Sequence, residues 1–129
     1  ADIVQLIEAA EELTKANCDL TLIIALSYGG RRAITLAAKE LAYRACKGTI
    51  KLDEISEEAF ELVLETQGVP NPDLVIRTSG EKRISNFLLW ECAYSEFVFF
   101  DTLWPDFSSE HLTKAVQEYC NRERRFGAA

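Results

Sequence analysis

Apolar positions along the chain follow two periods. Residues 2–16 and 31–47 carry apolar side chains at helical spacing with charged residues opposite them, which predicts two amphipathic helices. Residues 20–26, 73–76 and 96–100 are short apolar or aromatic runs, and the first two are typical of strands buried on both faces of a parallel sheet. Gly48 is expected to end the second helix.

Three shorter helices complete the predicted order. One begins after Ser56 and runs to about residue 66, another covers residues 85–92, and the last begins after Ser108 or Ser109 and reaches Arg122. The order α-β-α-α-β-α-β-α predicts an α/β fold, a parallel sheet with helices on both faces. Three strands are few for such a sheet, and the chain opens on a helix with no strand before it. We therefore expect the sheet to be incomplete, with its N-terminal strands absent.

Composition narrows the function classes. The chain has 129 residues, 48% of them hydrophobic, with 14 Lys and Arg against 21 Asp and Glu. This length suits about one domain, and the apolar content excludes intrinsic disorder. The net charge of −7 argues against nucleic-acid binding, which needs a basic face. The four cysteines form no C-x-x-C pair and only one histidine is present, so no familiar zinc-ligand spacing exists; we expect buried or half-buried reduced thiols.

The densest cluster of candidate chemistry is the loop of residues 77–86, which follows a predicted strand. Arg77, Arg83 and Ser85 lie within nine positions, and Gly80 permits a tight backbone. Ligands of open α/β sheets bind beyond the carboxyl ends of strands, and guanidinium groups pair with phosphate oxygens. The pattern favours a diphosphate site. The alternative is a solvated basic loop whose arginines pair with Glu81.

Three further positions carry weaker signals. Glu96 opens the aromatic strand and is a candidate Mg²⁺ ligand, although an exposed acid at a strand start is the commoner case. Gly29 and Gly30 permit close backbone approach ahead of Arg31, but a tight turn with a surface arginine explains them equally. The arginines of residues 122–125 suggest either an anion contact or a solvated helix end.

A long sequence signature favours the binding interpretations of these residues over the structural ones. Residues 73–97 read DLVIRTSGEKRISNFLLWECAYSEF, and residues 103–107 read LWPDF. This signature closely resembles that of the cis-prenyltransferases, above all the bacterial members. The segments YGGR at residues 28–31 and NRERRFG at residues 121–127 match two more family segments in the expected order. The resemblance covers nearly the whole chain.

The resemblance implies a function. Such enzymes condense isopentenyl diphosphate repeatedly onto an allylic diphosphate such as farnesyl diphosphate, with Mg²⁺, and the bacterial ones make the polyprenyl carrier lipid of cell-wall synthesis. The matching positions imply substrate binding by Arg77, Arg83, Ile84 and Ser85, and a metal ligand at Glu96. Gly30, Arg31 and Arg125 match more weakly, with Arg125 reaching a partner subunit's site.

Departures from the family pattern matter as well. Ser27 stands where the family has Asn, and Lys82 stands where some members have a histidine near the metal. The family's Asp-Gly-Asn-Gly-Arg-Trp segment, which binds the allylic diphosphate and Mg²⁺, does not occur in this sequence. We therefore expect residues 1–129 to be the C-terminal part of a single cis-prenyltransferase domain, with no catalytic residue of its own and no activity alone.

The resemblance also implies a setting for the whole enzyme. It would be a bacterial homodimer, cytoplasmic and peripheral to the inner membrane, that binds no nucleic acid. The alternative is a non-catalytic interaction subunit that supports a catalytic partner, because some eukaryotic relatives lack the aspartate motif. The Arg77, Arg83, Ser85 and Glu96 set argues against that alternative.

Overall fold

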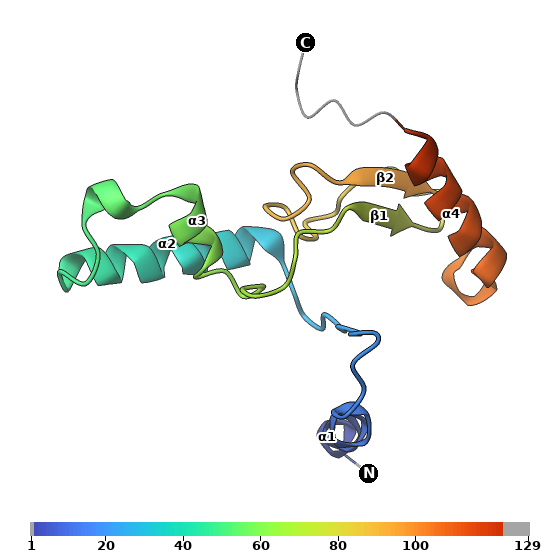
Figure 1. The fold of residues 1–129 in the computed structure, drawn as a ribbon, viewed down its shortest axis with the longest axis horizontal. Helices are drawn as coiled ribbons and strands as arrows, with labels where there is room; N and C mark the ends of the chain where they lie inside the picture. Colours follow the sequence, from blue (N-terminus) through green and yellow to red (C-terminus); the bar gives the residue numbers. More distant parts are fainter. Residues whose placement is uncertain (1, 123–129) are drawn as a thin grey trace.

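The computed structural model describes residues 2–122. Helix α1 (Ile3–Thr14) stands apart and is joined to the rest by an extended segment, as Figure 1 shows. Helices α2 (Gly30–Cys46) and α3 (Glu57–Glu61) lie together at one end of the molecule. Strands β1 (Leu74–Arg77) and β2 (Glu96–Phe99) lie at the other end with α4 (Ser109–Asn121) (Figure 1). The single-turn helices η1 (Leu52–Glu54) and η2 (Trp104–Asp106) occupy connections.

Helix α2 forms the better-packed part of the molecule. Ala33 and Ala37 are 2% and 1% exposed and form a core with Leu64, which follows α3. Phe60 and Trp90 pack against this core with their ring centroids 4.6 Å apart. The small alanines on α2 let the segment after α3 approach the helix closely. This packing fixes the position of the first turns of α2.

The two strands pair in parallel, as the α/β prediction requires. Leu74 lies opposite Glu96 and Arg77 lies opposite Phe99. Val98 of β2 is buried, and so is Ala115 of α4, the helix that contacts β2. The predicted helices at both ends of the sequence and the helix of residues 31–47 are confirmed. Gly48 has a φ of +69°, the left-handed conformation expected just past a helix end.

The predicted strand at residues 20–26 is wrong. This segment is extended but joins no sheet, and Leu20, Leu22 and Ile24 are 82%, 79% and 72% exposed. A strand needs a neighbour for its backbone N–H and C=O groups, and among the described residues β1 pairs only with β2. The apolar pattern is that of a buried strand, but among residues 2–122 no strand lies beside this segment to pair with it.

Two predicted helices also differ. Residues 85–92 form successive turns instead of a helix, because Ser85, Asn86 and Leu88 have positive φ angles of 51°, 65° and 46°. Left-handed residues cannot continue a right-handed helix. The helix after Ser56 ends at Glu61, and turns continue to Gly68, whose φ is +81°.

The thiol prediction holds only for Cys92, which is buried; Cys18, Cys46 and Cys120 are exposed free thiols. Cys18 lies in the extended segment, Cys46 ends α2 and Cys120 is near the end of α4, positions where nothing described packs over them. Among the described helices, none is long and apolar enough to span a bilayer.

Two leucines test the packing of the first core. Leu64 is 3% exposed and Leu62 is 68% exposed, within the same short segment. We expect Leu64→Ala to lower the free energy of unfolding by about 2–5 kcal/mol, because it removes buried methyl groups and leaves a cavity. Leu62→Ala, the matched control, should change it by less than about 0.5 kcal/mol. Urea unfolding followed by circular dichroism measures both; equal losses would contradict the packing described.

Candidate functional site

Arg77 organises the loop that follows β1. Its guanidinium nitrogen Nη1 donates to the hydroxyl oxygen of Ser85 at 2.9 Å and also to the backbone carbonyl oxygen of Arg83. Arg77 is half-buried at the carboxyl end of β1, so its position is fixed by the sheet. The loop therefore curls back over the strand end, and three of the four predicted substrate-binding residues meet.

The loop backbone is strained, and its ends are anchored. Ser79, Ser85 and Asn86 have φ angles of 70°, 51° and 65° without being glycines. Such residues cost about 1–3 kcal/mol each and persist only where the surroundings hold them. The amide of Ser79 donates to the carbonyl of Thr102 at 2.8 Å, and the amide of Gly80 donates to that of Phe100 at 2.9 Å. These bonds hold the backbone of the loop in one arrangement.

Arg83 differs from Arg77 in its surroundings. It pairs with Glu81, and the two side chains are 65% and 37% exposed. An exposed ion pair of this kind contributes about 0–1 kcal/mol to stability, so an incoming anion can replace Glu81 at little cost. The two arginines therefore have different roles. Arg77 stabilises the loop through its hydrogen bonds, and Arg83 presents a positive charge to solvent.

A cavity of about 200 Å³ lies beside these residues. The four predicted substrate-binding residues line it together with five others, which are Val75, Ile76, Phe87, Cys92 and Phe97. Burial raises the pKa of the Cys92 thiol, which keeps it neutral. The structure therefore brings all four predicted substrate-binding residues around one cavity, whose lining combines two arginines and a serine with mostly apolar side chains.

Gly30 and Arg31 reach the same loop through their backbones. The amide of Gly30 donates to the carbonyl of Asn86 at 2.7 Å, and the amide of Arg31 donates to the side-chain oxygen Oδ1 of Asn86 at 2.8 Å. A Cβ atom at Gly30 would lie 2.8 Å from Cγ of Leu89, so only glycine permits this approach.

Sequence reasoning missed Asn86. The available signal was a helix that begins at Gly29 and Gly30 with no capping side chain of its own, together with an asparagine in the candidate loop. Nothing in the sequence indicated that the two belonged together, because they are 55 residues apart.

Glu96 lies elsewhere on the sheet. It pairs with Leu74 at the amino end of the strands, three residue steps from the Arg77 pair, or about 10 Å along a strand. Its Oε2 accepts from Nη1 of Arg122 at 2.7 Å, and Arg122 also pairs with Glu118. The Glu96 carboxylate, then that of Glu118, raises the pKa of Arg122. The structure does not bring Glu96 to the Arg77 loop. Arg125 lies outside the described residues.

The described residues do not form a magnesium site by themselves. Residues 2–122 contain no group of three metal-binding side chains, and one oxygen of Glu96 is already engaged by Arg122. A single carboxylate holds Mg²⁺ only when phosphates or other groups supply the remaining oxygens. The metal role of Glu96 stays a prediction.

Comparison with known proteins decides the family. The family model described as "Putative undecaprenyl diphosphate synthase" matches residues 1–127. The chain belongs to the cis-prenyltransferase family. It is 55% identical over 92% of its length to the ditrans,polycis-undecaprenyl-diphosphate synthase of Micrococcus luteus, which is (2E,6E)-farnesyl-diphosphate specific. It is also 50% identical over 98% of its length to an isoprenyl transferase of Caulobacter vibrioides.

Solved cis-prenyltransferase-like structures share the fold. Lavandulyl diphosphate synthase from Lavandula x intermedia, in complex with dimethylallyl diphosphate, superposes with a TM-score of 0.89 at 41% identity over 96% of this chain. A "probable undecaprenyl diphosphate synthase" from Campylobacter jejuni gives a TM-score of 0.76 at 37% identity over 98% of this chain. The chain covers 53% and 57% of those two structures. It spans about half the length of the curated relatives it matches, 47% and 49% of the two named above.

The two arginines of this cis-prenyltransferase loop should differ in their effect on stability. We expect Arg77→Ala to lower the free energy of unfolding by about 1–3 kcal/mol, because it removes charge-assisted hydrogen bonds that hold the strained loop. Arg83→Ala should change it by less than about 0.5 kcal/mol, because its ion pair is exposed. Thermal and urea unfolding of the two variants test this, and a larger loss for Arg83→Ala would refute the division of roles.

Proposed function

We propose that this chain carries the isopentenyl-diphosphate-binding part of a cis-prenyltransferase that elongates an allylic diphosphate to undecaprenyl diphosphate. The observation that carries the proposal is the convergence of Arg77, Arg83 and Ser85 on one cavity with apolar walls. Two guanidinium groups and a hydroxyl suit a diphosphate, and an apolar wall suits the short isoprenoid attached to it. Its similarity to the Micrococcus luteus synthase supports the chain-elongating activity.

The chemistry explains why fixed arginines would hold this substrate. In each condensation the diphosphate of isopentenyl diphosphate stays on the growing chain. It is not the leaving group, so the protein needs only to hold it in a fixed position. Arg77 is locked by the sheet and the loop, and the backbone around Ser85 is already in its strained form. Little ordering cost therefore remains to be met on binding. Arg83 would exchange Glu81 for a phosphate oxygen.

In this proposal Mg²⁺ acts on the allylic diphosphate, and the isopentenyl diphosphate is held by the arginines. When bound, the metal would stabilise the negative charge that develops on the departing allylic diphosphate. Glu96 would supply one oxygen and the substrate phosphates others. The residues of this chain would then bind and orient the isopentenyl unit, while ionisation of the allylic partner depends on groups outside residues 2–122.

The remaining features of the whole enzyme belong to the same proposal. They are a homodimer, peripheral association of a cytoplasmic protein with the inner membrane, and a product that serves as the carrier lipid of cell-wall synthesis. The resemblance to bacterial cis-prenyltransferases implies them, and the two relatives named above are bacterial. The competing function, a non-catalytic subunit, has no need for a cavity lined by two arginines.

Diphosphate binding by the chain tests the proposal directly. Calorimetric titration with isopentenyl diphosphate in the presence of Mg²⁺ should show saturable binding. Arg83→Ala should weaken it by about 10- to 100-fold, because the lost bonds to a charged group are worth roughly 1.5–3 kcal/mol. Since Arg83 contributes little to stability, the loss reports binding alone.

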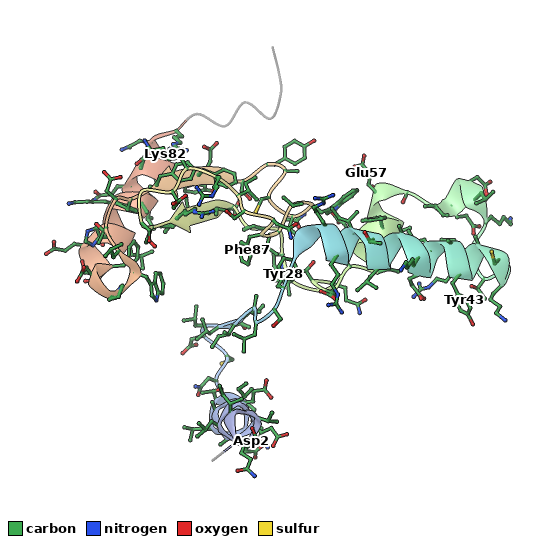
Figure 2. The ribbon with its side chains drawn as sticks, turned by 180° about the vertical axis from the view of Figure 1, so that it is seen from behind. Asp2, Tyr28, Tyr43, Glu57, Lys82 and Phe87 are labelled. Carbon is green, nitrogen blue, oxygen red and sulfur yellow. The ribbon has the colours of Figure 1, made fainter. Side chains whose placement is uncertain are left out.

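Lys82→Ala is the matched control for that titration. It removes the same charge from the neighbouring position of the same exposed loop, near the sheet as Figure 2 shows. Lys82 stands where some family members have a histidine near the metal, so the pair is also titrated without Mg²⁺. There Lys82→Ala should change the affinity by less than about threefold, as a screened surface charge does. Equal effects of the two substitutions would mean that the loop attracts the ligand only by its overall positive charge, without a specific site. Absence of any binding would favour the non-catalytic subunit, and preference for a nucleotide would indicate an unrelated anion site.

The chain alone should make no polyprenyl product. We expect no long-chain lipid when residues 1–129 are incubated with farnesyl diphosphate, radiolabelled isopentenyl diphosphate and Mg²⁺, because the aspartate segment to which the resemblance assigns allylic binding does not occur in this sequence. Thin-layer chromatography of the extracted lipids is the measurement, with a full-length relative as the positive control. Labelled product from this chain would contradict the expectation that the chain binds substrate without catalysing the condensation.

A further inference from the structure

The start of α2 is capped by a residue from the candidate loop. The first amides of a helix have no partner within the helix, and the preceding side chain usually accepts from them. Gly29 occupies that place and has no side chain, and no side-chain bond from it caps α2. Asn86 replaces it with two acceptors, its backbone carbonyl for Gly30 at 2.7 Å and its Oδ1 for Arg31 at 2.8 Å.

The packing around this cap is too close to be incidental. A Cβ atom at Gly29 would lie 3.0 Å from Nδ2 of Asn86, and one at Gly30 would lie 2.8 Å from Leu89. On the other side, the rings of Tyr28 and Phe87 meet edge to face with centroids 5.8 Å apart. Figure 2 shows these two side chains together at the junction between α2 and the sheet. Contacts at Asn86, Phe87 and Leu89 therefore hold this end of the loop against the start of α2 and the residues just before it.

Asn86 is joined by one peptide bond to Ser85, whose hydroxyl accepts from Arg77. Both residues have left-handed φ angles, 51° at Ser85 and 65° at Asn86. Asparagine tolerates this conformation better than other residues with a side chain. The strained pair is held on one side by the Arg77 guanidinium and on the other by the amides of α2, and α2 itself rests on the buried core of Ala33 and Ala37.

We propose that Asn86 is a positioning residue for the diphosphate: by capping α2 it holds Ser85, and through Ser85 the Arg77 guanidinium, in the arrangement that receives the ligand. This inference rests on the proposed function of the loop. The start of α2 then supports the binding site, although Asn86 does not itself line the cavity. Binding and the Arg31 hydrogen bond are then coupled, so each stabilises the other.

Three variants of the full chain separate positioning from simple helix stability. Asn86→Gly tolerates the left-handed backbone and keeps the backbone acceptor, and it removes the whole side chain together with Oδ1. Asn86→Asp keeps an oxygen that can accept from the Arg31 amide. Ser56→Ala is the matched control, because it removes one N-cap bond, from Ala59 at 3.2 Å, in a different helix.

The first measurement is the dissociation constant for isopentenyl diphosphate by calorimetry, at about 0.5 M salt so that the charge of Asp is screened. We expect Asn86→Gly to weaken binding about tenfold, the equivalent of one N-cap bond. Asn86→Asp should recover most of the affinity, and Ser56→Ala should leave it within about twofold despite a similar loss of stability.

The second measurement is hydrogen exchange of the Arg31 amide by NMR, with and without the same ligand. In the wild-type chain the ligand should slow this exchange, and in Asn86→Gly it should not. A cap that only stabilised α2 would show no dependence on the ligand.

The outcomes distinguish the two proposals. If the wild-type chain binds no isopentenyl diphosphate, the proposed function fails and this inference fails with it. If the wild type binds and Asn86→Gly binds equally well, or if Ser56→Ala weakens binding as much, the proposed function stands and the role of Asn86 is refuted.

Discussion

The hydrogen bonds from the Arg77 guanidinium to the loop that follows it are the contacts on which the candidate site depends. They turn the chain back over the end of β1, and they hold Ser85 and the carbonyl of Arg83 in place. A flexible basic loop would have to be ordered by its ligand at an entropic cost. Here the loop is already ordered when the parallel strands form, because Arg77, which holds the loop, is the last residue of β1.

The loop also connects the two ends of the molecule. One end is the sheet with α4, and the other is α2 with its alanine-lined core. Between them lie Asn86 at the start of α2 and the Tyr28–Phe87 ring contact. A residue that serves as a helix cap for one element and as loop backbone for the next makes the site sensitive to both. The loop therefore has little freedom to differ from its strained form.

Electrostatics at the site run opposite to those of the whole chain. The net charge of −7 describes the surface on average, yet Arg77, Arg83 and the neighbouring Lys82 lie close together in the sequence. Glu96, the one acid predicted to take part, is instead paired with Arg122 at the other end of the strands. Glu96 is therefore neutralised by Arg122, whereas the arginines of the loop line the cavity, where the exposed Arg83 pairs only with the exposed Glu81 among the ion pairs of the described residues.

The sequence by itself determined the family, the parallel strands at residues 73–76 and 96–100, the long helices, and the grouping of Arg77, Arg83, Ile84 and Ser85, which the structure places around one cavity. Those features are local, since periodicity, capping residues and a contiguous signature lie within short segments. Only the tertiary structure decided the rest. Residues 20–26 are strand-like in pattern but remain unpaired, because a strand exists only with a neighbour. Residues 85–92 are helix-like in pattern, but the bonds of Ser85 to Arg77 and of Asn86 to α2 hold a left-handed backbone there. Such contacts join residues far apart in the sequence, and no local pattern specifies which partners will meet.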